Sequence, residues 1–90
     1  MTTQRFVTQA IQTKYLGPTN THGSRIKAWC EAKSIIRPVD HSLNEAERHH
    51  AVAMELAAML AWPGEWYQGG LPSPSTGYCF VQPNLRVYVA

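Results

Sequence analysis

The sequence predicts an α+β fold, in which one helix packs on one face of an antiparallel sheet. Short runs of alternating polar and apolar residues occupy the first forty positions, and one stretch with helical spacing occupies the middle of the chain. Two further short runs follow it. The predicted order is therefore strand, strand, strand, helix, strand, strand. The 90 residues are expected to form a single domain over 1–90, with a flexible N-terminus over 1–6.

The first three predicted strands precede the helix. Residues 7–16 alternate loosely and are rich in β-branched and aromatic side chains. Residues 34–39 contain Pro38 near their end, which favours a sheet edge there. Residues 24–30 alternate cleanly between an apolar and a cationic face. The two faces are Ile26, Ala28 and Cys30 on one side and Arg25, Lys27 and Trp29 on the other.

The helix is predicted from two overlapping capping boxes. Ser42 and Asn44 each offer an N-cap oxygen, with a glutamate three residues further on. Pro63 and Gly64 end the segment near Trp62. The residues expected on its buried face are Ala46, His49, Ala53, Leu56, Ala57 and Leu60, and those expected to face outward are Glu47, Arg48, Ala51, Glu55 and Ala58.

Two short strands are predicted after the helix, over 78–82 and 85–89, with a turn at Pro83 and Asn84 between them. Before these strands, residues 65–68 lead to a break at Gly69 and Gly70 and then to a loop rich in proline and serine. The run 85–89 suits either the protein's own sheet or the edge of a second copy. The expected state is therefore a monomer or a homodimer.

Charge is distributed unevenly along the chain, although the net charge is only +2. Up to Arg37 there are six basic residues and one acidic residue, Glu31. From Asp40 to Glu65 there are five acidic residues and one basic residue, Arg48. This distribution predicts a molecule with a basic side and an acidic side.

No pattern in the sequence defines a catalytic, metal or cofactor site. The adjacent His49 and His50 point about 100° apart on a helix, whereas a helical metal pair needs a spacing of three or four. Cys30 lies on an apolar strand face and is expected to be a buried thiol rather than a nucleophile. Gly17 and Gly23 frame a polar loop but lack the lysine and the following helix of a phosphate-binding loop. We therefore expect a non-enzymatic protein without a metal or cofactor.

The cysteines and the hydropathy pattern suggest the location of the protein. Cys30 and Cys79 are far apart and show no CxxC spacing, which predicts reduced thiols in a cytoplasmic protein. The longest run with few charges, residues 51–62, is too short to span a bilayer. No membrane partner is expected.

The loop over 17–24 is the most distinctive motif. With its flanks it reads KYLGPTNTHGSRIKA, and this stretch, the Gly69-Gly70-Leu71 turn and the run 77–81 resemble short proteins encoded by phages, plasmids and integrated elements. The resemblance covers most of residues 7–81. It implies an accessory protein that acts in the cytoplasm of a bacterial host, and by analogy an inhibitor of host defence such as an anti-CRISPR protein.

The expected partner is a bacterial host protein or nucleoprotein complex, and the alternative is direct binding of nucleic acid. A strand face with two cations and a tryptophan suits both, because it can anchor a protein or hold phosphates and stack a base. If the helix covered that face, Trp29 would instead belong to the core. The candidate partner-binding residues are Thr19, Asn20, Thr21, His22, Arg25, Lys27, Trp29, Glu47 and Glu55, and Lys14 joins Arg25, Lys27 and Trp29 in the nucleic-acid alternative.

Overall fold

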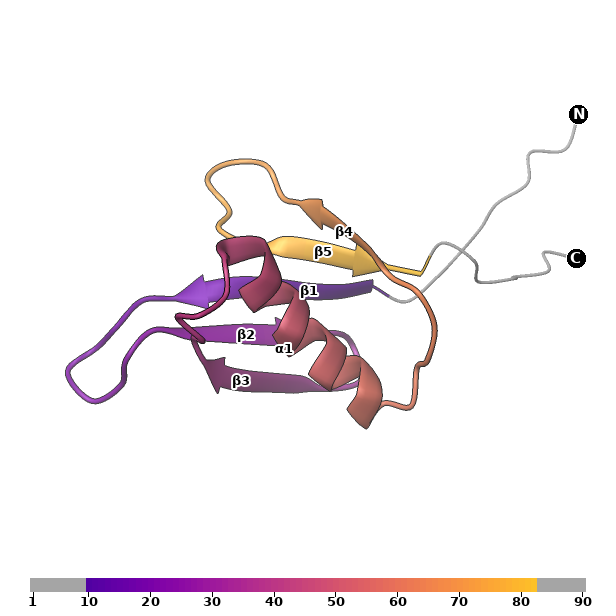
Figure 1. Ribbon diagram of the computed structural model, residues 1–90, viewed down its shortest axis with the longest axis horizontal. Helices are drawn as coiled ribbons and strands as arrows, with labels where there is room; N and C mark the ends of the chain where they lie inside the picture. Colours follow the sequence, from indigo (N-terminus) through magenta and orange to yellow (C-terminus); the bar gives the residue numbers. More distant parts are fainter. Residues whose placement is uncertain (1–9, 83–90) are drawn as a thin grey trace, which may run out of the picture.

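A five-stranded antiparallel sheet carries one helix on one of its faces (Figure 1). The computed structural model describes residues 10–82. Its elements are β1 (Ala10–Leu16), β2 (Arg25–Trp29), β3 (Ser34–Pro38), α1 (Glu45–Met59), β4 (Tyr67–Gly70) and β5 (Tyr78–Val81). The strand order is β3-β2-β1-β5-β4, which places the first strand at the centre. The predicted α+β class and element order are confirmed.

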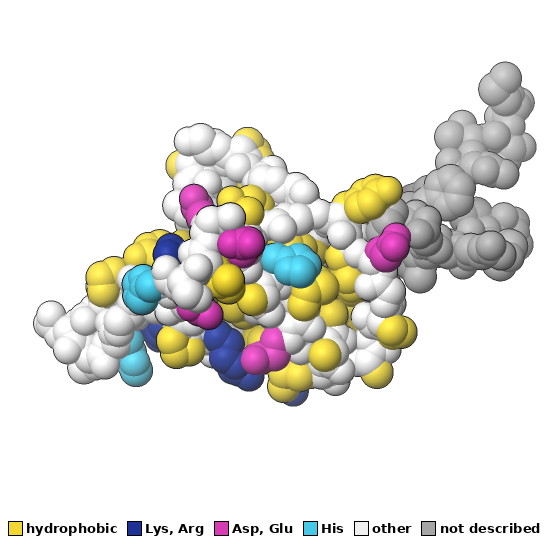
Figure 2. All heavy atoms as spheres, viewed as in Figure 1, with side chains coloured by type: hydrophobic (Ala, Val, Ile, Leu, Met, Phe, Trp, Pro, Cys, Tyr) yellow, Lys and Arg dark blue, Asp and Glu magenta, His cyan; other side chains and the backbone are white. Residues whose placement is uncertain are grey.

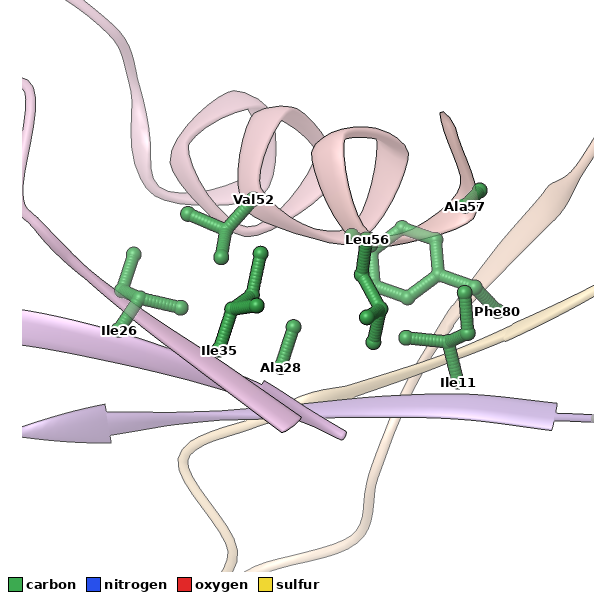
Figure 3. Packing of buried hydrophobic residues seen from close by; sticks show 9 residues of the cluster. Ile11, Ile26, Ala28, Ile35, Val52, Leu56, Ala57 and Phe80 are labelled. Atoms are coloured by element: carbon green, nitrogen blue, oxygen red, sulfur yellow. The ribbon is translucent and has the colours of Figure 1, made fainter. Parts of the chain in front are cut away.

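The core lies between α1 and the central strands. Ile11 and Phe80 are opposite each other on β1 and β5 and point toward Leu56 of the helix, and Val52 lies over Ile26 and Ile35 (Figure 3). Burying each such large side chain contributes roughly 1.5–3 kcal/mol. The buried apolar cluster comprises Ile11, Ile26, Ala28, Ile35, Val52, Ala53, Leu56, Ala57 and Phe80.

The helix begins at the second of the two predicted caps. Oδ1 of Asn44 accepts a hydrogen bond from the backbone N–H of Glu47 at 2.9 Å, and the Glu47 carboxylate accepts one from the backbone N–H of Asn44 at 3.0 Å. Ser42 instead donates its hydroxyl proton to the carboxylate of Asp40. The first turn is thus held by reciprocal capping, which satisfies amides that have no partner within the helix.

The helix ends at Met59, before the predicted end near Trp62. The backbone N–H of Trp62 bonds to the carbonyl of Ala57 at 2.9 Å, and that of Ala61 bonds to the carbonyl of Ala58 at 3.1 Å. Ala61 has a φ of 56°. This bonding pattern is a Schellman motif, in which the left-handed position is usually a glycine.

The buried stripe of the helix differs from the predicted one at three positions, one of which is Leu60, a half-buried residue just after the end of the helix. Ala46 is exposed, contrary to expectation, because capping rather than apolar packing holds the first turn and the stripe starts one turn later, at His49. Val52 is buried and was not predicted to be. The carbonyl of Ala46 instead accepts a hydrogen bond from Nε2 of Gln68 at 2.9 Å.

The fourth strand lies where the sequence predicted a break. Gly69 and Gly70 belong to β4 and pair with Cys79 and Tyr78 of β5. A strand at the edge of a sheet needs only backbone pairing, so two glycines are tolerated there. The predicted fifth strand over 85–89, the N-terminus over 1–6 and the first residues of the predicted strand 7–16 lie outside the described residues.

Candidate binding surface

One face of the sheet carries no helix among the described residues. Ile26 and Ala28 are buried beneath α1, and successive strand side chains point to opposite faces, so their neighbours on β2 point away from the helix. The predicted separation of the two faces of this strand is therefore confirmed, and Trp29 is not beneath the helix. We define the open sheet face by the side chains Lys14, Arg25, Lys27, Trp29 and Ile36.

Two lysines and a tryptophan form the centre of the open sheet face. Lys14 on β1 is directly opposite Lys27 on β2. Their ammonium groups lie 6.0 Å and 5.5 Å from the centroid of the Trp29 ring. Like charges at opposite positions of a strand pair are destabilising, and the aromatic ring offsets this by about 0.5–1 kcal/mol per exposed contact. The repulsion between the two ammonium groups is therefore offset in part by their contacts with the Trp29 ring.

The cations of the open sheet face have no acidic partner in the described part of the chain. Neither Lys14, Arg25 nor Lys27 forms an ion pair with another described residue. Nε of Arg25 is buried and finds no acceptor among the same residues. Three positive charges thus remain available to a ligand, beside an apolar neighbour, Ile36, that is 43 % exposed.

The helix side of the molecule has a different character. Glu47 and Glu55 lie on α1, and Figure 2 shows acidic side chains spread over this side, with basic side chains between them. Glu55 forms an ion pair with Arg37, and Nε of Arg48 donates to the carbonyl of Asp40 at 3.0 Å. Cations on this side are therefore engaged within the protein. The structure places Glu47 and Glu55 on the opposite side from Lys27 and does not bring them into one site.

The loop over 17–24 projects beyond the end of the sheet (Figure 1). Its residues Thr19, Asn20, Thr21 and His22 are all exposed. The backbone N–H of Thr19 bonds to the carbonyl of His22 at 2.7 Å, and the Thr19 hydroxyl accepts the backbone N–H of His22 at 3.1 Å. These bonds order the tip as a local side-chain turn. The loop leads directly into Arg25, so it adjoins the open sheet face at one end.

A polar contact lies inside the core, beneath the helix. The Thr13 hydroxyl accepts the backbone N–H of Tyr78 at 3.3 Å, so its own proton is available to Nδ1 of His49 at 2.7 Å. Burial lowers the pKa of His49, an effect that the nearby carboxylate of Glu45 partly opposes. The imidazole of His49 is therefore held in its neutral form, and Nδ1 accepts this proton in the tautomer that is protonated at Nε2. Sequence analysis placed it on the buried face but gave no partner, because Thr13 is 36 positions away.

The residues considered for chemistry do not come together. Cys30 packs against the core and Cys79 lies on another strand, and both thiols are free. Within residues 10–82, no group of three histidine, cysteine or acidic side chains is placed to hold a metal ion. At the C-terminal end of α1, Trp62 and Trp66 stack at 6.3 Å and line an apolar pocket without a charged side chain. The open sheet face is thus the surface with the most distinctive chemistry.

Comparison with known proteins finds no matching family model, no similar curated protein and no similar solved structure. No helix in the described part of the chain has the length and apolar character needed to cross a membrane. The fold and its surface define an α+β domain with a basic and aromatic sheet face. A function is therefore assigned from that face and from the sequence motif beside it.

Proposed function

We propose that this protein is a non-enzymatic binding protein whose open sheet face contacts an anionic partner in the cytoplasm of a bacterial host. The observation that supports this most is that the three cations of the open sheet face, two of them beside the Trp29 ring, have no acidic partner in the described residues. A half-buried tryptophan flanked by basic side chains is typical of the residues that dominate binding energy at interfaces.

The setting of the proposed function rests on the sequence motif. YLGPTNTHGSRIKA resembles stretches of phage and mobile-element proteins, and the structure displays its exposed half as an ordered loop next to the open sheet face. The proposed partner is a host protein or nucleoprotein complex. One role that this arrangement would serve is to occupy a contact surface of a host defence complex that is acidic or resembles nucleic acid.

An enzymatic role has less support from the geometry. Cys30 packs against the core rather than facing a cleft, and the ring of His49 is hydrogen-bonded to Thr13 in the interior. A nucleophile and its base must lie within hydrogen-bonding reach of each other and of a substrate. Binding by a preformed surface requires no such arrangement.

Affinity capture from a bacterial lysate with two charge-matched double variants tests the proposal. Lys14→Ala/Lys27→Ala removes two positive charges from the open sheet face, and Ala51→Glu/Ala58→Glu adds two negative charges on exposed positions of the helix. Both lower the net charge equally. We expect the lysine variant to lose the proteins that the wild type retains, and the helix variant to keep them. Equal behaviour of the two variants, or loss only in the helix variant, would overturn the assignment of the face.

A further inference from the structure

We infer that the open sheet face binds single-stranded nucleic acid. This inference rests on the proposed function, because it names the chemical class of the anionic partner for the same face. It combines three observations: cations that lack acidic partners, an aromatic ring among them, and a second exposed ring at the far edge of the sheet.

The cations are spaced to follow a phosphate backbone. Lys14 and Lys27 are opposite each other, about 5 Å apart at their Cβ atoms, and Arg25 precedes Lys27 by two positions, roughly 7 Å along the strand. Phosphate oxygens can accept hydrogen bonds from these three cations, which have no carboxylate partner among the described residues. Neutralising them releases counterions, so the resulting affinity falls as salt rises.

The position of Trp29 favours a single strand over a duplex. Its ring lies beside both lysines on a flat sheet, where a base with a free face can stack on it while the ammonium groups turn to the phosphates. Bases inside a duplex are already stacked on their neighbours. Reading a duplex from its major groove takes a helix or a two-stranded ribbon, but α1 lies on the other side of the sheet, and β1 and β2 are flanked by β5 and β3 rather than forming a separate ribbon.

Tyr67 offers a second stacking position. Its partner in the sheet is Val81, which alternates with the buried Phe80, so the register assigns Tyr67 to the open side of β4. It is 64 % exposed. Three strand spacings, about 14 Å, separate β4 from β2. An extended single-stranded nucleic acid that crosses the sheet from Lys27 and Trp29 therefore reaches a second aromatic ring, that of Tyr67. Between the two rings it passes over uncharged side chains, which include that of Gln12.

Fluorescence anisotropy of labelled oligonucleotides tests this inference. The probes are oligothymidine and oligouridine of about 12 nucleotides and a DNA duplex of equal length. We expect both single strands to bind, with a slope of log Kobs against log salt of about −2, since each of three neutralised phosphates contributes about −0.7. Binding of the duplex is expected to be weaker at every salt concentration.

Variants separate the charge contribution from the stacking contribution. Lys27→Ala is expected to reduce the steepness of the salt slope by about 0.7. Trp29→Leu keeps an apolar side chain and is expected to weaken binding about tenfold or more with the slope unchanged, and Tyr67→Leu is expected to act in the same direction. Ala51→Glu changes the net charge as Lys27→Ala does but lies on the helix, so it is the matched control and should retain wild-type binding. Thermal unfolding of each variant verifies that the fold is intact.

Several results would overturn the inference. They are absence of binding to either single strand at low salt, equal affinity for the duplex, and equal weakening by Ala51→Glu and Lys27→Ala. If no single strand binds but Lys14→Ala/Lys27→Ala still loses its proteins in affinity capture, the partner is a protein and the proposed function stands. If capture is also unaffected, both proposals are wrong.

Discussion

Lys14 and Lys27 are directly opposite each other on β1 and β2, with both ammonium groups near the ring of Trp29. This pair of like charges costs stability. We attribute its presence to the binding proposed for this face. We therefore expect that a mutation which removes the like-charge pair raises the stability of the fold and weakens binding.

Lys14→Glu is expected to stabilise the fold while weakening the binding proposed for this face. An opposite-charge pair replaces a like-charge pair, which contributes about 0.2–1 kcal/mol and raises the Tm of a domain of this size by a few degrees. Thermal unfolding at low salt measures the effect, and the gain should shrink as salt is added. Lys33→Glu makes the same charge change at an exposed turn position and is the control. A lower Tm for Lys14→Glu than for this control would contradict the prediction.

Ala61→Gly is expected to stabilise the protein by about 0.5–1 kcal/mol. Ala61 occupies the left-handed position of the helix C-terminal motif, with a φ of 56°, where a side chain costs roughly 1–2 kcal/mol that glycine avoids, less its greater freedom when unfolded. Ala51→Gly, at an exposed position within α1, should instead destabilise by about 1 kcal/mol. Urea unfolding of both variants checks the opposite signs, and a loss of stability in Ala61→Gly would refute the conformational explanation.

Acidification is expected to destabilise the fold through His49. Burial lowers the pKa of its imidazole in the folded state, while the unfolded value is about 6.5. The unfolded chain therefore binds the proton first, so the contribution of His49 is fully present above pH 6.5 and declines as the pH falls from there toward the lowered folded pKa, with a slope of at most about 1.4 kcal/mol per pH unit. His49→Gln keeps an acceptor for Thr13 and removes the titration. Urea unfolding across this range should show a smaller pH dependence in His49→Gln, and identical profiles would contradict the prediction.

A second acidic window belongs to Asp40 and lies lower. Hydrogen bonds from the Ser42 side chain and backbone lower the pKa of this carboxyl below 3.8. Its contribution is therefore present above that value and is lost only as the pH falls further. The difference between wild type and His49→Gln near pH 6 consequently reports on His49.

Gly77→Ala is expected to destabilise by roughly 2–3 kcal/mol, a typical cost of overpacking. A Cβ atom at this buried position would lie 1.7 Å from the carbonyl oxygen of Thr13, and main-chain atoms of β1 have little freedom to move. Gly23→Ala is the matched control, because a Cβ there meets nothing within 4 Å and the position is exposed. The two free energies of unfolding, from urea titration, should differ by at least 2 kcal/mol. Equal values would show that β1 and β5 can separate without loss.

Features set by neighbouring residues were predictable from the sequence. The capping box at Asn44 and the alternation across β2 depend on side chains within a few positions of one another. The three cations and Trp29 were likewise grouped correctly on one strand face and its neighbour. For the binding surface, the spacing of residues along the chain predicted which side chains share a face. It did not predict which other side chains they contact.

Features set by tertiary contacts were not predictable in the same way. Which face of β2 the helix covers depends on packing between distant segments, and β4 contains Gly69 and Gly70 because β5 offers it a backbone edge. The polar contact between Thr13 and His49 joins residues 36 positions apart. Ala46 shows the same limit within the helix. Its spacing predicted a buried side chain, but the first turn is held by the capping hydrogen bonds and needs no apolar packing.

The central place of β1 has a consequence for synthesis on the ribosome. Its partners are β2, which follows at once, and β5, which emerges only after the helix and β4. A nascent chain that has not reached Tyr78 exposes a row of unpaired amides and carbonyls along β1, and such an edge can recruit another strand. The last described strand therefore covers the edge of β1 and joins β4 to the sheet, and fragments that end before it are expected to self-associate.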